Sequence, residues 1–188
     1  MKRALSFLAA ACLLAPSLAA QTSSIFEVRP FIGANVPTGT QRDFMKDAPM
    51  FGLQAGVEMR PSFHFVATGA WIAGKDKYAF TQDKVNVLQY TAGIELGRPM
   101  GMGETWEFRP FIGVGAGART FLYQATELGD KTCAAAYGAI GGEFQVGRTA
   151  LRAEARDYLY CYRDPMGVAE SLTRNDLNFA IGLAYHFR

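Results

Sequence analysis

The sequence has little of what enzymes and metal proteins usually require. Its 188 residues include two histidines and three cysteines, and no group of them has the spacing of metal ligands. Ser62 and His64 come nearest to a nucleophile with its base, and no third group stands beside them in the sequence. Most of the 20 glycines follow the alternation of the predicted strands instead of opening a helix, so no phosphate-binding loop is predicted. We therefore expect no enzyme, no cofactor and no metal site.

An excess of charge of one sign is also absent. The chain has 19 basic and 17 acidic residues. Without Lys2 and Arg3, which belong to a leader segment, 17 basic residues face 17 acidic ones. Because nucleic-acid binding depends on a surplus of lysine and arginine, this balance predicts no nucleic-acid partner.

Residues 1–20 have the composition of a secretory signal peptide. A basic start precedes an apolar run over residues 4–14, and small residues then suit cleavage after Ala19 or Ala20. The alternative is a lipoprotein signal acylated at Cys12, but Cys12 lies inside the apolar run. We expect residues 1–20 to be cleaved and residues 21–188 to form one exported domain.

Long apolar runs are missing from the rest of the chain. No stretch after residue 20 contains 18 consecutive apolar residues, which excludes a helical membrane protein. The chain is nevertheless 49% hydrophobic and 13% aromatic. These residues alternate with polar residues or glycine over eight blocks, at 26–36, 51–60, 63–71, 88–97, 106–119, 135–146, 151–160 and 178–187. A period of two predicts β-strands whose two faces have different surroundings.

The connections between these blocks alternate in length. Short ones fall at residues 60–62, 98–104 and 147–148, and longer, more polar ones at 38–49, 75–84, 124–132 and 163–174. Outer-membrane barrels combine short periplasmic turns with long extracellular loops. The layout therefore predicts an all-β fold: an eight-stranded antiparallel up-and-down transmembrane β-barrel with short periplasmic turns and four longer extracellular loops.

The polar face of the predicted strands combines glycines with charges of both signs. The narrow interior of a small barrel needs glycine beside large side chains, whereas the polar face of a soluble sandwich does not. We assign to the interior Glu27, Arg29, Glu58, Arg60, Glu95, Glu107, Arg109, Arg119, Glu143, Arg152, Glu154 and Arg156. Because an unpaired buried charge costs several kcal/mol, these side chains are expected to pair. They form either a plug that closes the lumen or a gate whose partners exchange, and we favour the plug.

Two cysteines follow the leader, Cys133 and Cys161, in a compartment where disulfides persist. Counting back from the turn at Gly147 places them nearly opposite each other on adjacent strands, which suits a disulfide. The alternative is two free thiols, because Cys161 follows the lipid-facing set of residues and Cys133 follows the inward set.

Three segments resemble the small OmpA/OmpX-like outer-membrane barrels of the broad outer-membrane β-barrel domain family. They are Arg29–Gly33, Leu151–Tyr158 and the closing Gly182–Phe187. The resemblance implies a place in the bacterial outer membrane, among its lipids and lipopolysaccharide. The closing segment resembles the C-terminal signal of the family, which implies recognition of the last strand by the barrel-assembly machinery.

Two functions stay open for such a barrel: a structural or surface-interaction role, or a narrow gated pore for small solutes. A lipid-modifying enzyme is a third and weaker alternative, because His64 and His186 are expected near the periplasmic rim, as polar residues in an aromatic girdle. Acidic residues expected on the outer loops, mostly solvated, are Asp76, Asp83, Glu127, Asp130, Asp164, Glu170 and Asp176.

Overall fold

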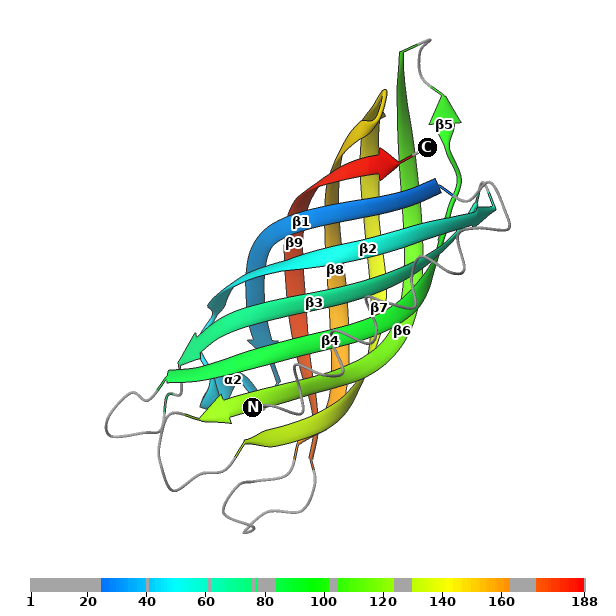
Figure 1. Cartoon of the computed structure of the whole chain (residues 1–188). Coiled ribbons are helices and arrows are strands. Elements are labelled where there is room, and N and C mark those ends of the chain that lie inside the picture. Colours follow the sequence, from blue (N-terminus) through cyan, green and yellow to red (C-terminus); the bar gives the residue numbers. More distant parts are fainter. Residues whose placement is uncertain are drawn as a thin grey trace.

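The chain forms one sheet of long antiparallel strands that closes on itself. The computed structural model describes residues 25–39, 41–60, 62–75, 77, 84–101, 105–123, 130–162 and 172–187, so the expected leader lies outside the described residues. The long strands are β1 (Ile25–Thr38), β2 (Ala48–Arg60), β3 (Phe63–Lys75), β4 (Lys84–Gly97), β6 (Trp106–Tyr123), β7 (Lys131–Val146), β8 (Thr149–Tyr162) and β9 (Leu172–Phe187). The short elements are a helix, α2 (Gln41–Phe44), and a strand, β5 (Met100–Gly101) (Figure 1).

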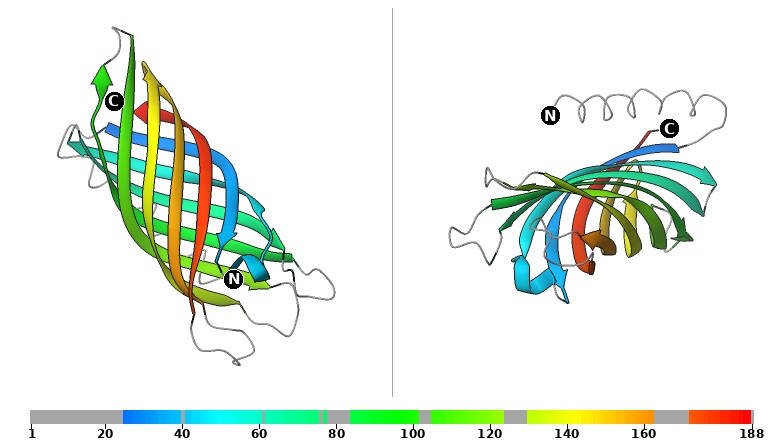
Figure 2. Two further views of the ribbon diagram at one scale, coloured as in Figure 1. Left: turned by 180° about the vertical axis from the view of Figure 1, so that it is seen from behind. Right: turned by 90° about the horizontal axis from the view of Figure 1, so that it is seen from below.

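Strand pairing closes the barrel. Each long strand pairs with the next long strand of the chain, and β1 also pairs with β9 (Figure 2). The short β5 pairs with the first residues of β6, and β4 also pairs directly with β6. The predicted eight-stranded antiparallel barrel is confirmed. Among the described residues, no helix is long and apolar enough to cross a membrane.

The register sets the tilt of the strands. Starting at Glu27, the line of paired residues passes through Gly56, Val66, Gly93, Gly115, Tyr137, Tyr158 and Asp176. It returns to β1 at Pro37, ten residues beyond its start. A shear of this size in eight strands tilts them by roughly 40° and leaves an interior just wide enough for side chains.

The two ends of the barrel differ in their connections. At the turn end, β1 begins and β9 ends, two-residue turns join β2 to β3 and β7 to β8, and residues 98–105, which include β5, join β4 to β6. Gly147, in the two-residue turn between β7 and β8, has a φ of 62°, a conformation that favours glycine. The opposite end, the loop end, carries α2 and four connections, at residues 39–47, 76–83, 124–130 and 163–171 (Figure 1). The predicted alternation of short turns and long loops holds for the turns at 61–62 and 147–148, but the connection at 98–105 is as long as the loop at 76–83.

The outer wall is apolar and the interior is charged, the reverse of a soluble protein. Ile32 and Leu183 are 71% and 64% exposed, while Arg29 and Arg152 are 1% and 2% exposed. This arrangement is stable where hydrocarbon surrounds the wall. At the turn end the rings of Phe26 and Phe187 lie 5.8 Å apart between centroids, beginning an aromatic girdle.

Three strands begin four or more residues earlier than the alternation predicts. β4 begins at Lys84, β7 at Lys131 and β9 at Leu172, instead of near residues 88, 135 and 178. At the start of β4 the alternation is inverted, since Val85 and Val87 face the lumen while Lys84 and Asn86 face outward. In β7 and β9 the first residues are mostly polar or small, so the alternation that marks a lipid-facing strand is lost there. The expectation that Asp176 lies on a loop is wrong, because it is a lumen residue of β9 and 2% exposed. Asp130 is exposed, and the other acidic residues expected on loops lie outside the described residues.

Candidate functional site in the barrel lumen

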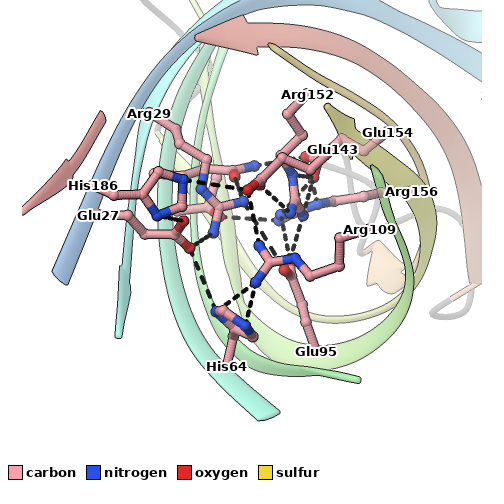
Figure 3. Close-up of polar contacts among 12 residues, drawn as sticks. Glu27, Arg29, His64, Glu95, Arg109, Glu143, Arg152, Glu154, Arg156 and His186 are labelled. Carbon is pink, nitrogen blue, oxygen red and sulfur yellow. Dashed lines mark hydrogen bonds and ion pairs between the residues drawn. The ribbon is translucent and has the colours of Figure 1, made fainter. Parts of the chain in front are cut away.

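A polar site fills the half of the lumen nearest the turn end. Its charged members, which we call the lumen network, are Glu27, Arg29, Glu95, Arg109, Glu143, Arg152, Glu154 and Arg156, each at most 8% exposed. They come from β1, β4, β6, β7 and β8, because every second side chain of a strand points inward. Figure 3 shows these side chains converging from the surrounding walls. The structure thus brings together eight of the twelve charged residues expected inside.

Arg152 of β8 holds carboxylates from three strands. Its Nη2 lies 2.6 Å from Glu95 Oε1 and 2.8 Å from Glu154 Oε2. Its Nη1 lies 3.6 Å from Glu143 Oε2. The guanidinium also lies over the Phe111 ring, 3.6 Å from the centroid. One buried cation therefore connects β4, β7 and β8 and packs on an aromatic ring of β6.

Arg29 connects the opposite side of the barrel to the same carboxylates. It forms an ion pair with Glu27 of its own strand and donates from Nη1 to Gln54 Oε1 at 3.0 Å. Gln54 in turn donates from Nε2 to Glu154 Oε1 at 2.6 Å. Arg156 pairs with the same Glu154 oxygen through Nε at 2.9 Å. These bonds cross the lumen from β1 and β2 to β8.

Both histidines lie in the lumen beside the network. His64 of β3 is 2% exposed and contacts Arg109 through Nε2, while Arg109 Nη2 pairs with Glu143 Oε1 at 3.0 Å. His186 of β9 lies 3.6 Å from Glu27 Oε2 through Nδ1 and 3.3 Å from Glu143 Oε1 through Nε2. Their expected position near the turn end is confirmed. The expectation that they belong to the girdle is wrong, because both occupy inward positions of the alternation.

A second polar cluster lies nearer the loop end, around Arg119 of β6. Arg119 pairs with Asp176 Oδ2 at 2.5 Å and donates to Asn35 Oδ1 at 2.7 Å. Tyr160 donates to the same Asp176 oxygen at 3.1 Å, and its ring centroid lies 4.9 Å from the Arg119 guanidinium. Buried apolar side chains fill the space around this cluster, including Met50, Ile72, Val87 and Phe121. Charge patterning in the sequence predicted Arg119 but not this apolar filling.

Three charges that were expected inside do not belong to the network. Glu58 and Glu107 are half-buried, and Arg60 is exposed. The register of β2 shifts between Glu58 and Arg60, and such a bulge redirects the side chains beyond it. Glu107 lies where β6 pairs with β5, beyond its pairing with β4. At these strand ends the alternation no longer separates the lumen from the surroundings.

Glycines make room for the large interior side chains, as the sequence predicts. A Cβ added at Gly56 would collide with the Glu27 carboxylate and lie 2.9 Å from Arg29 Nη2. A Cβ added at Gly93 would collide with the Tyr137 hydroxyl. The narrow barrel can therefore hold large charged and aromatic side chains because the facing strands have glycine, and so no side chain, at these positions.

The interior side chains leave little free space. Two cavities in the described lumen have volumes of about 10 Å³ each. Thr68, Gln89 and Arg156 are among the residues lining the first, and Arg29, Gln54 and Arg152 are among those lining the second. A cavity of roughly 10–15 Å³ accepts a single water molecule. A solute that passes through either cavity must therefore displace side chains that line it, among them Arg29, Arg152 and Arg156 of the network.

Sequence reasoning missed the uncharged polar residues of the site. Gln54, Thr68 and Gln89 are each at most 5% exposed, and Thr68 accepts a hydrogen bond from Arg156 at 3.0 Å. Gln89 donates to the Tyr158 hydroxyl at 2.9 Å. The signal that identifies them is position: each occupies an inward place in its strand, but a search for charge alone does not select them.

The two cysteines lie on opposite faces of the barrel wall. Cys133 of β7 is buried on the lumen side, whereas Cys161 of β8 is exposed on the outside. The register pairs Ala135 with Tyr160, so the cysteines are also one position out of alignment. No disulfide joins them. The expected disulfide is thus absent, because alternation separates the two thiols across the wall.

We expect the two thiols to differ strongly in reactivity. In the folded protein a small membrane-permeant maleimide should modify Cys161 and reach Cys133 only after unfolding, because Cys161 lies on the outer face whereas Cys133 is buried in the lumen. Replacement of Cys161 with serine should abolish the reaction of the folded protein, and Cys133→Ser should leave it unchanged. Mass spectrometry of the labelled protein measures both rates. Equal rates, or a mass that shows a disulfide, would contradict this structure.

Comparisons with known proteins agree with the architecture. Residues 5–187 match a family model described as the outer membrane protein beta-barrel domain. Among solved structures, the outer membrane protein OprG of Pseudomonas aeruginosa shares 14% identity, with 88% of this chain and 96% of that one covered and a TM-score of 0.57. Neisserial surface protein A shares 9% identity, with 87% and 97% covered and a TM-score of 0.53.

A third similar structure is the attachment invasion locus protein Ail of Yersinia pestis. It shares 12% identity, with 87% of this chain and 98% of that one covered and a TM-score of 0.50. No curated protein gives a significant match. These identities show the fold alone, whereas the family model covers nearly the whole chain. The chain therefore belongs to the outer membrane protein β-barrel domain family and is a protein of the bacterial outer membrane.

Proposed function

We propose that this protein is a barrel with a sealed lumen and a structural or surface-interaction role in the outer membrane. The observation that carries this proposal is the lumen network, in which four arginines and four glutamates pair across the interior with almost no exposure. Removing one partner of a buried ion pair costs roughly 3–5 kcal/mol. Opening a path through several such pairs is therefore unfavourable.

The loop end supports the interaction role. Four connections of seven to nine residues leave the barrel there, whereas two of the three connections at the turn end have only two residues. The similar barrel Ail was solved in complex with the heparin analogue sucrose octasulfate. We infer that the loop end of this chain faces the outside of the cell and contacts a partner there.

We also propose that the last strand is recognised by the barrel-assembly machinery and that the outer wall contacts lipopolysaccharide. Tyr185 and Phe187 of β9 are 41% and 49% exposed, and their ring centroids lie 4.8 Å apart. These exposed rings are accessible to an assembly factor before β9 pairs with β1. Enzymatic activity is not part of the proposal, because His64 and His186 are held in the lumen network at the turn end.

A narrow gated pore is the second candidate, and the surroundings of Arg152 favour it. Three carboxylates, of Glu95, Glu143 and Glu154, lie within 3.6 Å of its nitrogens. Arg152 can therefore exchange one carboxylate partner for another without becoming unpaired. Exchange of this kind would open a path only if the remaining side chains moved with it.

Ion conductance in planar bilayers distinguishes the two candidates. We expect the folded wild-type protein to give no stable openings, because hydrated ions do not fit the described cavities of about 10 Å³. Arg109→Ala removes a network cation, and Arg60→Ala, at an exposed position, is the matched control. If the wild-type protein gives openings, and these change in Arg109→Ala but not in Arg60→Ala, the sealed barrel is ruled out and the gated pore is supported.

A further inference from the structure

Three lysines stand together at the loop end of β2, β3 and β4. Lys75 and Lys84 are direct partners in the register of β3 with β4. The backbone N–H of Lys46, just before β2, donates to the Lys75 carbonyl at 3.2 Å. All three side chains are exposed. We call Lys46, Lys75 and Lys84 the lysine cluster; it lies where these strands end side by side (Figure 1).

The lysine cluster has an unfavourable charge arrangement in the isolated protein. Like charges placed directly opposite each other on adjacent strands destabilise a sheet. None of the carboxylates in the described part of the chain forms an ion pair with these three lysines. Lys77 adds a further cation nearby, since its Nζ donates to the Arg42 carbonyl of the adjacent helix. A bound anion would relieve this repulsion.

Acidic residues close to the cluster in sequence do not cancel it in the described structure. Asp43 and Asp47 are exposed and form no ion pair with the lysine cluster. Asp76 and Asp83 lie outside the described residues. Against Asp43 and Asp47 stand the three lysines, Lys77 and the exposed Arg42. The described surface of this rim is therefore basic.

The wall below the lysine cluster changes from polar to apolar along the same two strands. Towards the turn end, the outward pairs are Ala73 with Asn86, Trp71 with Leu88 and Gly69 with Tyr90. Lys75 and Trp71 are four positions apart on β3, which corresponds to about 10 Å along the barrel axis at the usual strand rise and tilt. Aromatic rings mark the membrane interface in such barrels. The lysine cluster thus lies at the height of lipid head groups.

The same wall also has room for an acyl chain. Gly69 has open space where a Cβ would project, since nothing lies within 4 Å of that position. Its neighbour Tyr90 is 40% exposed. Gly69 is the direct partner of Tyr90 and lies two residues from Trp71 on β3, so the wall carries no side chain at this outward position below the lysine cluster.

We propose that the lysine cluster binds the phosphate groups of a phosphorylated glycolipid of the outer leaflet, with an acyl chain lying against the wall at Gly69. Lysine binds phosphate as a point charge, and basic residues next to a membrane surface attract anionic head groups. The continuous apolar wall below the charges favours a lipid over a free anion. The proposal rests on the proposed outward orientation of the loop end and the proposed contact of the wall with lipopolysaccharide, and it is independent of whether the lumen conducts.

Displacement of a fluorescent lipid A from the folded protein in phosphatidylcholine nanodiscs tests the proposal. We expect unlabelled lipid A to displace the probe, and Lys75→Gln/Lys84→Gln to weaken binding by about 30-fold, the effect of two basic residues near an anionic surface. The control Lys131→Gln/Arg148→Gln removes two cations elsewhere and should change binding less than about twofold. A lysine variant that binds within about twofold of wild type would overturn the proposal.

Two competitors identify the ligand. Dephosphorylated lipid A that displaces the probe as well as lipid A would show that phosphate is not recognised. If inorganic phosphate displaces the probe at the same concentration as lipid A does, the cluster is a site for free anions and not for a lipid. Either outcome overturns the proposal, and weak displacement by both supports it.

Lys84→Glu provides a second test that a purely structural role cannot reproduce. In neutral lipid this change should raise the unfolding midpoint, because it places an opposite charge across from Lys75. In nanodiscs that contain lipid A it should lower the midpoint, because it removes a phosphate contact. If Lys84→Glu shifts the unfolding midpoint in the same direction in both lipids, the proposal is overturned.

Discussion

Replacing Arg152 with alanine is expected to lower the free energy of unfolding by about 3–5 kcal/mol. The change leaves Glu95 and Glu154 without the cation that lies 2.6 Å and 2.8 Å from their oxygens. Both carboxylates are at most 8% exposed, so water cannot replace the lost partner. The Arg152→Ala change also removes the guanidinium that packs on the face of the Phe111 ring. Equilibrium unfolding by denaturant in detergent micelles measures the loss.

Arg60→Ala is the control for this experiment, since Arg60 is exposed and lies outside the network. Its cost should stay within about 0.5 kcal/mol. The double change Arg152→Met with Glu95→Gln should recover part of the loss, because it removes charges of both signs together. If Arg152→Ala costs no more than Arg60→Ala, the buried ion pairs do not stabilise this barrel.

Replacing Gly93 with leucine is expected to lower the free energy of unfolding by at least about 3 kcal/mol, or to prevent folding. A Cβ at Gly93 would collide with the Tyr137 hydroxyl and would lie 2.5 Å from the Val114 carbonyl oxygen and 2.9 Å from the Gly115 Cα. The tyrosine can turn aside, but the two backbone atoms belong to the paired strand β6 and cannot move without breaking the sheet.

Gly69→Leu is the matched control, because it makes the same chemical change on the neighbouring strand β3. Nothing lies within 4 Å of a Cβ at Gly69, which faces outward. In a membrane or micelle we expect this variant to fold with unchanged or higher stability, since it adds apolar surface to the lipid-facing wall. The fraction folded and the denaturation midpoint report both variants. Equal losses at the two glycines would show that interior space does not limit this barrel.

The network links stability to closure of the lumen. The same ion pairs that stabilise the barrel also fill the path that a solute would take, so a variant that loses stability in the network should also leak first. Arg109 is the informative position, because it contacts both Glu143 and His64 near the turn end, and its loss leaves Glu143 with only the more distant Arg152 and His186. This is why the conductance experiment uses Arg109 and not a residue of the outer wall.

The arrangement of strands could be predicted from local sequence alone. Alternation with a period of two identifies eight strands, and the lengths of the connections assign them to two ends. The inward position of Arg29, Arg109 and Arg156 follows from the same alternation, and all three are buried. Prediction fails where the alternation fades. This happens in the first residues of β9, which include Asp176, and at the bulged end of β2, where Arg60 is exposed.

The partners of the buried charges could not be predicted in this way. Arg152 and Glu95 are 57 residues apart, and Arg119 and Asp176 are also 57 apart, yet each pair is in contact. Which inward side chains meet depends on the shear of the closed sheet, which moves the line of neighbours ten residues along β1 in one circuit. The separation of Cys133 from Cys161 likewise follows from register and not from their spacing in the chain.

The sequence by itself therefore determined the topology of this protein and the face of the wall on which most side chains lie, because both depend on a local period that every strand repeats. Only the tertiary structure decided which charges pair, which residues fill the lumen and which lysines stand opposite each other. Those contacts join residues from different strands, and they exist only once tilt and register have closed the barrel.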